Sequence, residues 1–229
     1  MEILPGLYGI DFGGRVWAYL LRTGRRWTLI DAGFAGDLPL IEAELGTLDA
    51  KVSHIGRIVL THCHLDHVGT VAEIQKMSEV ETMAHRLDAP VIRCEATVAE
   101  PVLSEQEKRL MEQLQAGGMT EAPPASVERE LEDGDTIDLG GDEALVVHVP
   151  GHTDGSIALY VASRGLLFTG DAVASLGRPI VGVFNVDPKR ARQSFKRLAE
   201  LEFEAACFGH GSPMTSGAAE AMRKVAEFL

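Results

Sequence analysis

A dense group of metal-binding side chains lies near residue 64. Residues 61–67 read T-H-C-H-L-D-H, so three imidazoles and one carboxylate fall within six residues. If the buried strand predicted at 58–61 continues to His64, then His62 and His64 point to the same face, because side chains alternate along a strand. A turn would bring Asp66 and His67 over the same spot, at the start of the next helix. Imidazole and carboxylate together suit zinc, iron or manganese, whereas calcium prefers oxygen ligands alone.

Three later positions each place one metal-capable side chain directly after an apolar strand pattern. In each case a glycine precedes that side chain and permits a sharp backbone turn. The three positions are His152 after Gly151, Asp171 after Gly170, and His210 after Gly209. Any one of them could be an ordinary turn residue, and the first cluster alone could be a solvated strand end. Their combination predicts a metal site assembled from four separate places in the chain.

The surrounding sequence predicts the elements that must position these side chains. Strands are expected over 8–12, 16–21, 27–31, 58–61, 80–84, 136–139, 144–149, 157–161, 166–169 and 205–208. Helices are expected over 37–49, 68–79, 104–117, 187–201 and 216–229. Ser104 and Glu107 form a capping box, and Asp187 is an N-cap before Pro188. This order predicts two sheets packed face to face with helices outside.

Composition bounds the class of protein. The 229 residues are 45% hydrophobic and 24% charged, which allows a buried core and excludes wholesale disorder. The net charge of −13 disfavours nucleic acid and anionic membranes as partners. No apolar run is long enough to span a membrane, the first residues lack a secretory-signal pattern, and three scattered cysteines form no disulfide framework. We expect a single cytoplasmic domain over 1–229 that acts on a small molecule, with a homodimer left open.

The strand that ends at Asp31-Ala32-Gly33, together with the histidine and aspartate motifs, resembles the metallo-β-lactamase superfamily over about residues 7 to 213. The resemblance implies an α/β (α+β) fold, a four-layer αββα sandwich with a two-metal site at one edge of the sheets. Zinc is the favoured metal, with iron or manganese as alternatives. Asp31 would either order the site or cap the chain locally. The implied ligands are His62, His64 and His152 for the first metal, Asp66, His67 and His210 for the second, and Asp171 as the bridge between them.

The resemblance also implies an enzyme, a dinuclear metal-dependent hydrolase. A metal-bound hydroxide would cleave an ester, thioester or lactone bond, and Asp66 would orient it and carry a proton to the leaving group. Residues 150–156 and 168–171 are similar to hydroxyacylglutathione hydrolases (glyoxalase II-like enzymes) and to lactonases. Two departures leave the substrate open. Only 19 residues follow His210, too few for the helical domain of glyoxalase II, and Ala174 stands where acyl-homoserine lactonases have tyrosine.

Two alternatives use the same scaffold. A persulfide dioxygenase-like oxidoreductase would bind one iron through two histidines and an aspartate, yet this chain retains every second-metal residue. A non-catalytic binding module would tend to lose ligands, and none is lost here.

Several further residues have two interpretations each. A helical insertion around 100–125 is expected near the active site, where it either shapes the substrate pocket or lies as a solvated surface helix. Arg178 either meets an anionic substrate group or faces solvent. Cys63 should point away from the metal because side chains alternate. The remaining residues in this class are Met111, Leu114 and Met119, as pocket wall or ordinary packing, and His54, His85 and His148, which match no ligand position.

Overall fold

Seven strands from the first part of the chain form a mixed sheet in the order β1-β2-β3-β4-β5-β6-β7. The computed structural model describes residues 1–116 and 121–229. β2 and β3 form the predicted hairpin, with Tyr8 opposite Leu20, and β4 to β7 run parallel to one another. The strands are β1 (Glu2–Leu4), β2 (Leu7–Asp11), β3 (Trp17–Thr23), β4 (Arg26–Ile30), β5 (Ile55–Val59), β6 (Glu81–His85) and β7 (Arg129–Leu131).

Five later strands form a second sheet in the order β14-β11-β10-β9-β8. β10 is antiparallel to both β9 and β11, while β14 is parallel to β11, so β9, β11 and β14 all end at the same edge. A separate two-stranded ribbon follows β11. The bounds are β8 (Thr136–Asp138), β9 (Glu143–His148), β10 (Ile157–Val161), β11 (Leu166–Phe168), β14 (Ala205–Cys207), and β12 (Val173–Ser175) with β13 (Pro179–Val181) in the ribbon.

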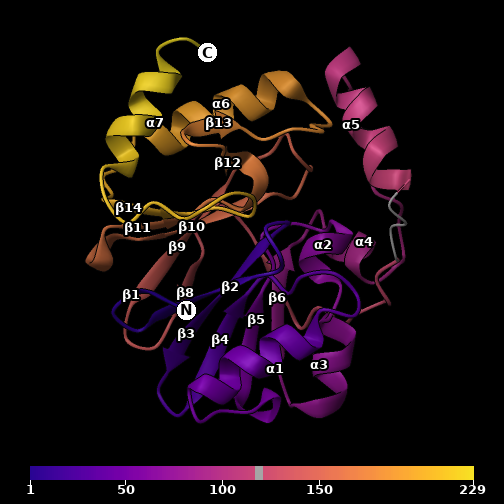
Figure 1. Cartoon of the computed structure of the whole chain (residues 1–229), viewed down its shortest axis with the longest axis vertical. Helices are drawn as coiled ribbons and strands as arrows, with labels where there is room; N and C mark the ends of the chain where they lie inside the picture. Colours follow the sequence, from indigo (N-terminus) through magenta and orange to yellow (C-terminus); the bar gives the residue numbers. More distant parts are fainter. Residues whose placement is uncertain (117–120) are drawn as a thin grey trace.

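The helices lie outside the two sheets, as Figure 1 shows. They are α1 (Leu38–Thr47), α2 (Leu65–Val68), α3 (Val71–Met77), α4 (Ala89–Ile92), α5 (Glu105–Ala116), α6 (Pro188–Ala199) and α7 (Ala218–Ala226), with 3-10 turns η1 (Val52–His54), η2 (Ala162–Arg164) and η3 (Gly170–Ala172). Within residues 1–116 and 121–229, no helix has the length and apolar character that crossing a bilayer demands.

Three hydrophobic cores separate four layers. Alternation along β3 divides its side chains, because Leu20 packs with α1 and α3 on the outer face whereas Tyr19 and Leu21 face the second sheet. The third core lies between the second sheet and helices α6 and α7, where Leu167 packs near Phe195. Helix, sheet, sheet and helix therefore follow one another, and the predicted αββα sandwich is confirmed.

Helix ends follow the chemistry read from the sequence. At α5, the Ser104 backbone N–H donates to Glu107 Oε2 at 2.8 Å and the Glu107 N–H donates to Ser104 Oγ at 3.3 Å, which completes the predicted capping box. At α6, Asp187 Oδ1 accepts from the backbone N–H groups of residues 189 and 190 at 2.9 and 3.0 Å. Residue 117, where the helix expected over 104–117 ends, and the predicted pocket residue Met119 lie outside the described residues.

Two predicted elements differ from the structure. The strand expected at 58–61 is β5, which begins at Ile55 and ends at Val59, so it does not reach the histidines. The helix expected at 68–79 is two helices, because the chain turns at Gly69. Gly69 lies against the backbone of the 34–35 turn, where a Cβ atom would be 2.1 Å from the Ala35 nitrogen. Its N–H donates to the Gly33 carbonyl at 2.8 Å, which fixes this close approach.

Candidate metal centre

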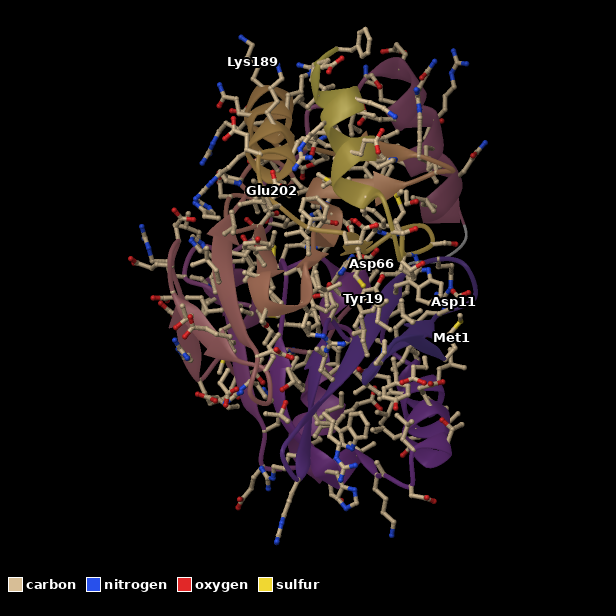
Figure 2. The ribbon with its side chains drawn as sticks, turned by 90° about the vertical axis from the view of Figure 1, so that its left-hand side faces the viewer. Met1, Asp11, Tyr19, Asp66, Lys189 and Glu202 are labelled. Atoms are coloured by element: carbon tan, nitrogen blue, oxygen red, sulfur yellow. The ribbon has the colours of Figure 1, made fainter. Side chains whose placement is uncertain are left out.

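The seven predicted ligand side chains come from the ends of both sheets. Residues 62–67 follow β5, whereas the other three follow β9, β11 and β14, which end at one edge of the second sheet. Asp66 accordingly lies centrally in Figure 2, where the purple N-terminal part meets the orange and yellow C-terminal part. The site is thus built across the junction between the two sheets.

The loop after β5 presents the first four side chains. The backbone is held there because the Thr61 carbonyl accepts from the Ile157 N–H at 2.9 Å, across the sheet junction. His64 is the residue immediately before α2, and Asp66 and His67 lie in the single turn of that helix. The expectation that His62 and His64 share a face through strand alternation was therefore wrong in its cause. The loop between β5 and α2, rather than a continued strand, brings them together.

Two triplets of residues each bring their potential ligand atoms close together. In each triplet the ligand atoms are all within 4.8 Å: His62, His64 and His152 form one, and Asp66, His67 and His210 form the other. These are the two sets that the sequence resemblance implies. Each draws two members from the loop after β5 and one from the second sheet.

Asp171 lies between the two triplets. Its Oδ1 is 3.4 Å from His67 Nε2, and its Oδ2 is 3.0 Å from His210 Nε2 and 3.5 Å from His152 Nε2. Its Oδ2 is also 4.0 Å from His62 Nε2. One carboxylate therefore faces histidines of both sets, which is the position expected of a bridging group. That these residues bind metal remains a prediction.

Contacts on the far side of the rings fix which nitrogen faces the centre. His67 Nδ1 lies 2.9 Å from Asp31 Oδ2, His152 Nδ1 lies 3.0 Å from the Val183 carbonyl, and His210 Nδ1 contacts the Arg15 carbonyl. A carbonyl or carboxylate oxygen can only accept, so each Nδ1 carries a proton and each Nε2 faces the centre, where it can coordinate a metal once it carries no proton of its own. Lone pairs directed inward are what metal coordination requires.

Three atoms at the centre lack partners. Among the described residues, His62 Nε2, His67 Nε2 and Asp171 Oδ1 are buried without a hydrogen-bond partner. A buried unpaired polar atom costs about 1–3 kcal/mol, so three in one place need an explanation. All three belong to the triplets or to the group between them. A divalent cation would satisfy them, and the residues present fit such a cation.

Charge is distributed unevenly over the two triplets. Burial, and next the neighbouring His64, lowers the pKa of His152 to about 4, and burial likewise lowers the pKa of His62. Asp171 raises the pKa of His210 to about 10, against the effect of burial. Burial opposes ionisation of Asp66, yet His67 and His210 lower its pKa to about 2. The first triplet therefore offers neutral imidazoles, whereas the two histidines of the second lie in the negative field of Asp66 and Asp171, a field that also attracts cations.

Asp31 orders the site, which decides between its two predicted roles. It is 2% exposed and adopts a left-handed backbone conformation with φ of 58°. Oδ1 accepts from the Thr61 backbone N–H at 2.8 Å, and Oδ2 accepts from the Thr61 hydroxyl at 2.8 Å and from His67 at 2.9 Å. One carboxylate therefore anchors the loop after β5 and orients a ring within it.

Asp88 is a site residue that the sequence reasoning missed. It is 2% exposed, and its Oδ2 accepts from the Cys63 N–H at 2.9 Å and the Thr153 hydroxyl at 2.8 Å. Its Oδ1 accepts from the Gly155 N–H at 2.8 Å. Asp88 therefore joins the loop of residues 62–67 to the loop that carries His152. Its place just beyond β6, at the edge where the other functional residues lie, was the signal that could have found it.

The remaining sequence predictions have clear positions. Cys63 is buried in the outer core of the first sheet, as expected of a residue that is not a ligand. His85 and His148 stack with ring centroids 4.2 Å apart, away from the two triplets. Glu107 in α5 accepts from the Phe184 N–H at 3.0 Å, so this helix is tied to the loop whose Val183 carbonyl holds His152. Arg178 lines a separate cavity described below.

The chain is similar in sequence and fold to several known proteins. The probable metallo-hydrolase YflN of Bacillus subtilis (strain 168) is 29% identical over 93% of this chain and 87% of its own length. The hydroxyacylglutathione hydrolase of Cereibacter sphaeroides (strain ATCC 17029) is 29% identical over 76% of this chain. This chain spans only 55% of that enzyme's length. A protein crystallised in a di-iron-bound form, TTHA1623, is 29% identical with a TM-score of 0.69, over 97% of this chain and 100% of that one.

A family model described as the metallo-beta-lactamase superfamily matches residues 11–210. That span includes the whole first sheet from the end of β2 onward and all seven residues of the two triplets and Asp171. The family binds divalent metals through clusters of histidine and aspartate such as those found here, and its relatives include metallo-hydrolases. The chain belongs to the metallo-beta-lactamase superfamily.

Proposed function

We propose that this protein is a dinuclear metal-dependent hydrolase that cleaves an ester, thioester or lactone bond of a small molecule. The observation that carries the proposal is Asp171, which faces histidines of both triplets at 3.0–4.0 Å. A carboxylate in this position compensates the repulsion between two adjacent cations. His62, His64 and His152 would hold one cation, and Asp66, His67 and His210 the other.

Divalent cations held at this position would supply Lewis acidity and would activate water near neutral pH, which is the chemistry that hydrolysis needs. The protein's own contribution begins with Asp66, whose low pKa keeps it a carboxylate at neutral pH. Its Oδ2 lies 3.3 Å from His210 Nε2, and its side chain is 18% exposed. Asp66 can therefore orient a water molecule and hold a proton on its way to the leaving group.

The relatives favour acyl-bond hydrolysis over oxidation. Similarity to hydroxyacylglutathione hydrolases supports a thioester as the first substrate class to test. A mononuclear iron oxidoreductase is disfavoured because the second triplet is complete, with its three ligand atoms within 4.8 Å. The relative in a di-iron-bound form supports two metals and keeps iron beside zinc as a candidate.

The test is a metal count combined with a substrate screen. Purified protein, loaded separately with zinc, iron or manganese, is analysed for metals and assayed with S-lactoylglutathione, aliphatic lactones and aryl esters. We expect about two metals per chain and hydrolysis of at least one acyl substrate, lost with a chelator and restored by metal. One metal per chain together with oxygen consumption on a persulfide, and no acyl hydrolysis, would refute the proposal.

A further inference from the structure

A cavity of about 840 Å³ lies between the N-terminal end of α5, β13 and the helices α6 and α7. Figure 1 shows these elements gathered at the C-terminal end of the molecule, with α5 standing beside the α6 and α7 layer. Its volume is in the range of small-molecule sites, roughly 300–1,000 Å³. None of the seven residues of the candidate metal centre lines it. The cavity therefore belongs to a different site.

The cavity wall is apolar on one side. Ile180 and Val181 of β13 and Val225 of α7 line it, together with Phe228. Phe228 is 87% exposed, which makes it the most exposed large hydrophobic side chain among the described residues. A wall of this kind gains free energy when an alkyl chain covers it, at about 25 cal/mol per Å² of apolar surface.

Positive charge surrounds the same cavity. Arg178, Arg192 and Lys224 line it, whereas the protein as a whole carries a net charge of −13. Lys224 pairs with Glu220 at 2.6 Å, but neither arginine has a carboxylate within 4.0 Å among the described residues. The single acidic side chain of the lining, Glu107, already accepts from Ser104 and from a backbone N–H. Two guanidinium groups are therefore left to meet an anion.

A buried acceptor gives the third constraint. Asn185 lines the cavity and is 6% exposed, and its Nδ2 donates to the Gly182 carbonyl at 2.6 Å. Its Oδ1 has no hydrogen-bond partner among the described residues. Since an unsatisfied buried acceptor costs about 1–3 kcal/mol, a ligand that brings an N–H or O–H group to this atom would be favoured.

We propose that this cavity binds an amphiphilic anion: an alkyl chain joined through an amide or a hydroxyl-bearing link to a carboxylate or phosphate. The alkyl chain would lie on the wall formed by Ile180, Val225 and Phe228. The anionic end would meet Arg178 and Arg192, and the link would donate to Asn185. The site is separate from catalysis and does not depend on the function proposed above.

The backbone of residues 182–185 lies between this cavity and the metal centre. Its inner side holds the catalytic region, because the Val183 carbonyl accepts from His152 Nδ1 at 3.0 Å and the Gly182 N–H donates to the Ala172 carbonyl at 3.3 Å. Val183 and Asn185 also line the cavity. A ligand in the cavity and a substrate at the metals would thus occupy opposite sides of one segment and would not compete.

The experiment measures binding of N-decanoylglycine to the metal-loaded protein by isothermal titration calorimetry, below the critical micelle concentration of the probe. We expect one saturable site per chain. Arg192→Ala should weaken binding about five- to tenfold, and Val225→Trp, which fills the cavity, should abolish it. Lys196→Ala is the matched control, because Lys196 is exposed on the same helix, α6, but does not line the cavity. Sodium decanoate, which has no N–H group, should bind about five- to tenfold more weakly than N-decanoylglycine.

Three results would overturn the proposal. The first is the lack of saturable binding, and the second is equal weakening by Arg192→Ala and Lys196→Ala. The third is competition between N-decanoylglycine and a hydrolysed substrate, which would place the probe at the metals. Circular dichroism checks the fold of Val225→Trp, and if that variant fails to fold, the pair on α6 and the comparison of the two probes decide the question.

Discussion

Replacement of Asp31 by asparagine tests how the centre is held. In the native protein Oδ2 accepts from His67 Nδ1, so the proton lies on Nδ1 and Nε2 faces the cluster. In Asp31→Asn, the side-chain oxygen must stay with the Thr61 backbone N–H, which Oδ1 contacts at 2.8 Å. The amide NH₂ then faces His67 Nδ1, which must become an acceptor. The proton moves to Nε2 and blocks the lone pair that would bind metal.

The hydrogen bonds of the Asp31 carboxylate determine how much metal affinity and stability the substitution should remove. Loss of partners around a metal-binding histidine typically lowers metal affinity about 10- to 100-fold, and we expect this at the triplet of Asp66, His67 and His210. The removal of one charge-assisted hydrogen bond should lower the free energy of unfolding by about 1–3 kcal/mol. Asp31→Ala would instead leave three buried donors unpaired and place alanine at φ of 58°, at a cost of roughly 4–11 kcal/mol that threatens folding. Asparagine tolerates this backbone conformation and is the informative variant.

The assay is a zinc titration in competition with a chromophoric chelator, followed by thermal unfolding of the loaded protein. Asp49→Asn is a matched control, since Asp49 is also a left-handed aspartate, with φ of 52°, but is exposed. We expect one of two binding steps to weaken in Asp31→Asn and both to persist in Asp49→Asn. Two steps of native affinity in Asp31→Asn would refute the tautomer argument.

Four further predictions concern single side chains. His64→Ala should abolish hydrolysis and lower the metal content measured by mass spectrometry while circular dichroism stays native; full activity would remove His64 from the ligand set. Asp66→Asn should lower kcat by a large factor, about 100-fold or more, through loss of charge and of proton transfer; an unchanged kcat would exclude this role. Asp88→Asn should lower the free energy of unfolding by about 1–3 kcal/mol and also reduce metal content, because its NH₂ group would face the backbone N–H of either Gly155 or Cys63. Native metal content would limit Asp88 to a structural role. Burial, and next the stacked His148, lowers the pKa of His85 to about 4. The unfolded state therefore takes up a proton first as the pH falls, and stability is lost between about pH 6.5 and pH 4. Tm measured against pH should fall less steeply in His85→Gln, and parallel curves for the two proteins would refute the assignment.

Much of this fold could be predicted because its pattern is local. The β2–β3 hairpin depends on a turn at Gly13-Gly14, both with positive φ, and β10 appears with the bounds that its apolar run indicates. The short strands β1, β7, β12 and β13 were not predicted. They have three residues each, and their pairing partners come from distant segments or from loops around the site. Three residues give too little periodicity to distinguish a strand from a loop.

The composition of the candidate site could be predicted, but its construction could not. The residue types, and the glycine before each of the three later candidates, indicated which side chains meet, since strand ends at one edge of a sheet converge. Nothing local showed that β5 stops at Val59 or that Asp88 lies under two loops, because these facts depend on contacts such as that between the Ile157 N–H and the Thr61 carbonyl, almost a hundred residues apart. A buried carboxylate that only accepts backbone and hydroxyl protons has no motif in a single sequence, so the position of Asp88 just beyond β6 was its one signal.

The origin of each triplet in both sheets has a consequence for folding. A cation held by His62 and His152 closes a loop of about 90 residues, and one held by His67 and His210 closes a longer one. Such closures restrict the unfolded chain much as a disulfide of the same span would, an effect on the order of 4–5 kcal/mol. The metals would then crosslink the two sheets. A chelator should therefore increase the rate of unfolding as well as stop turnover.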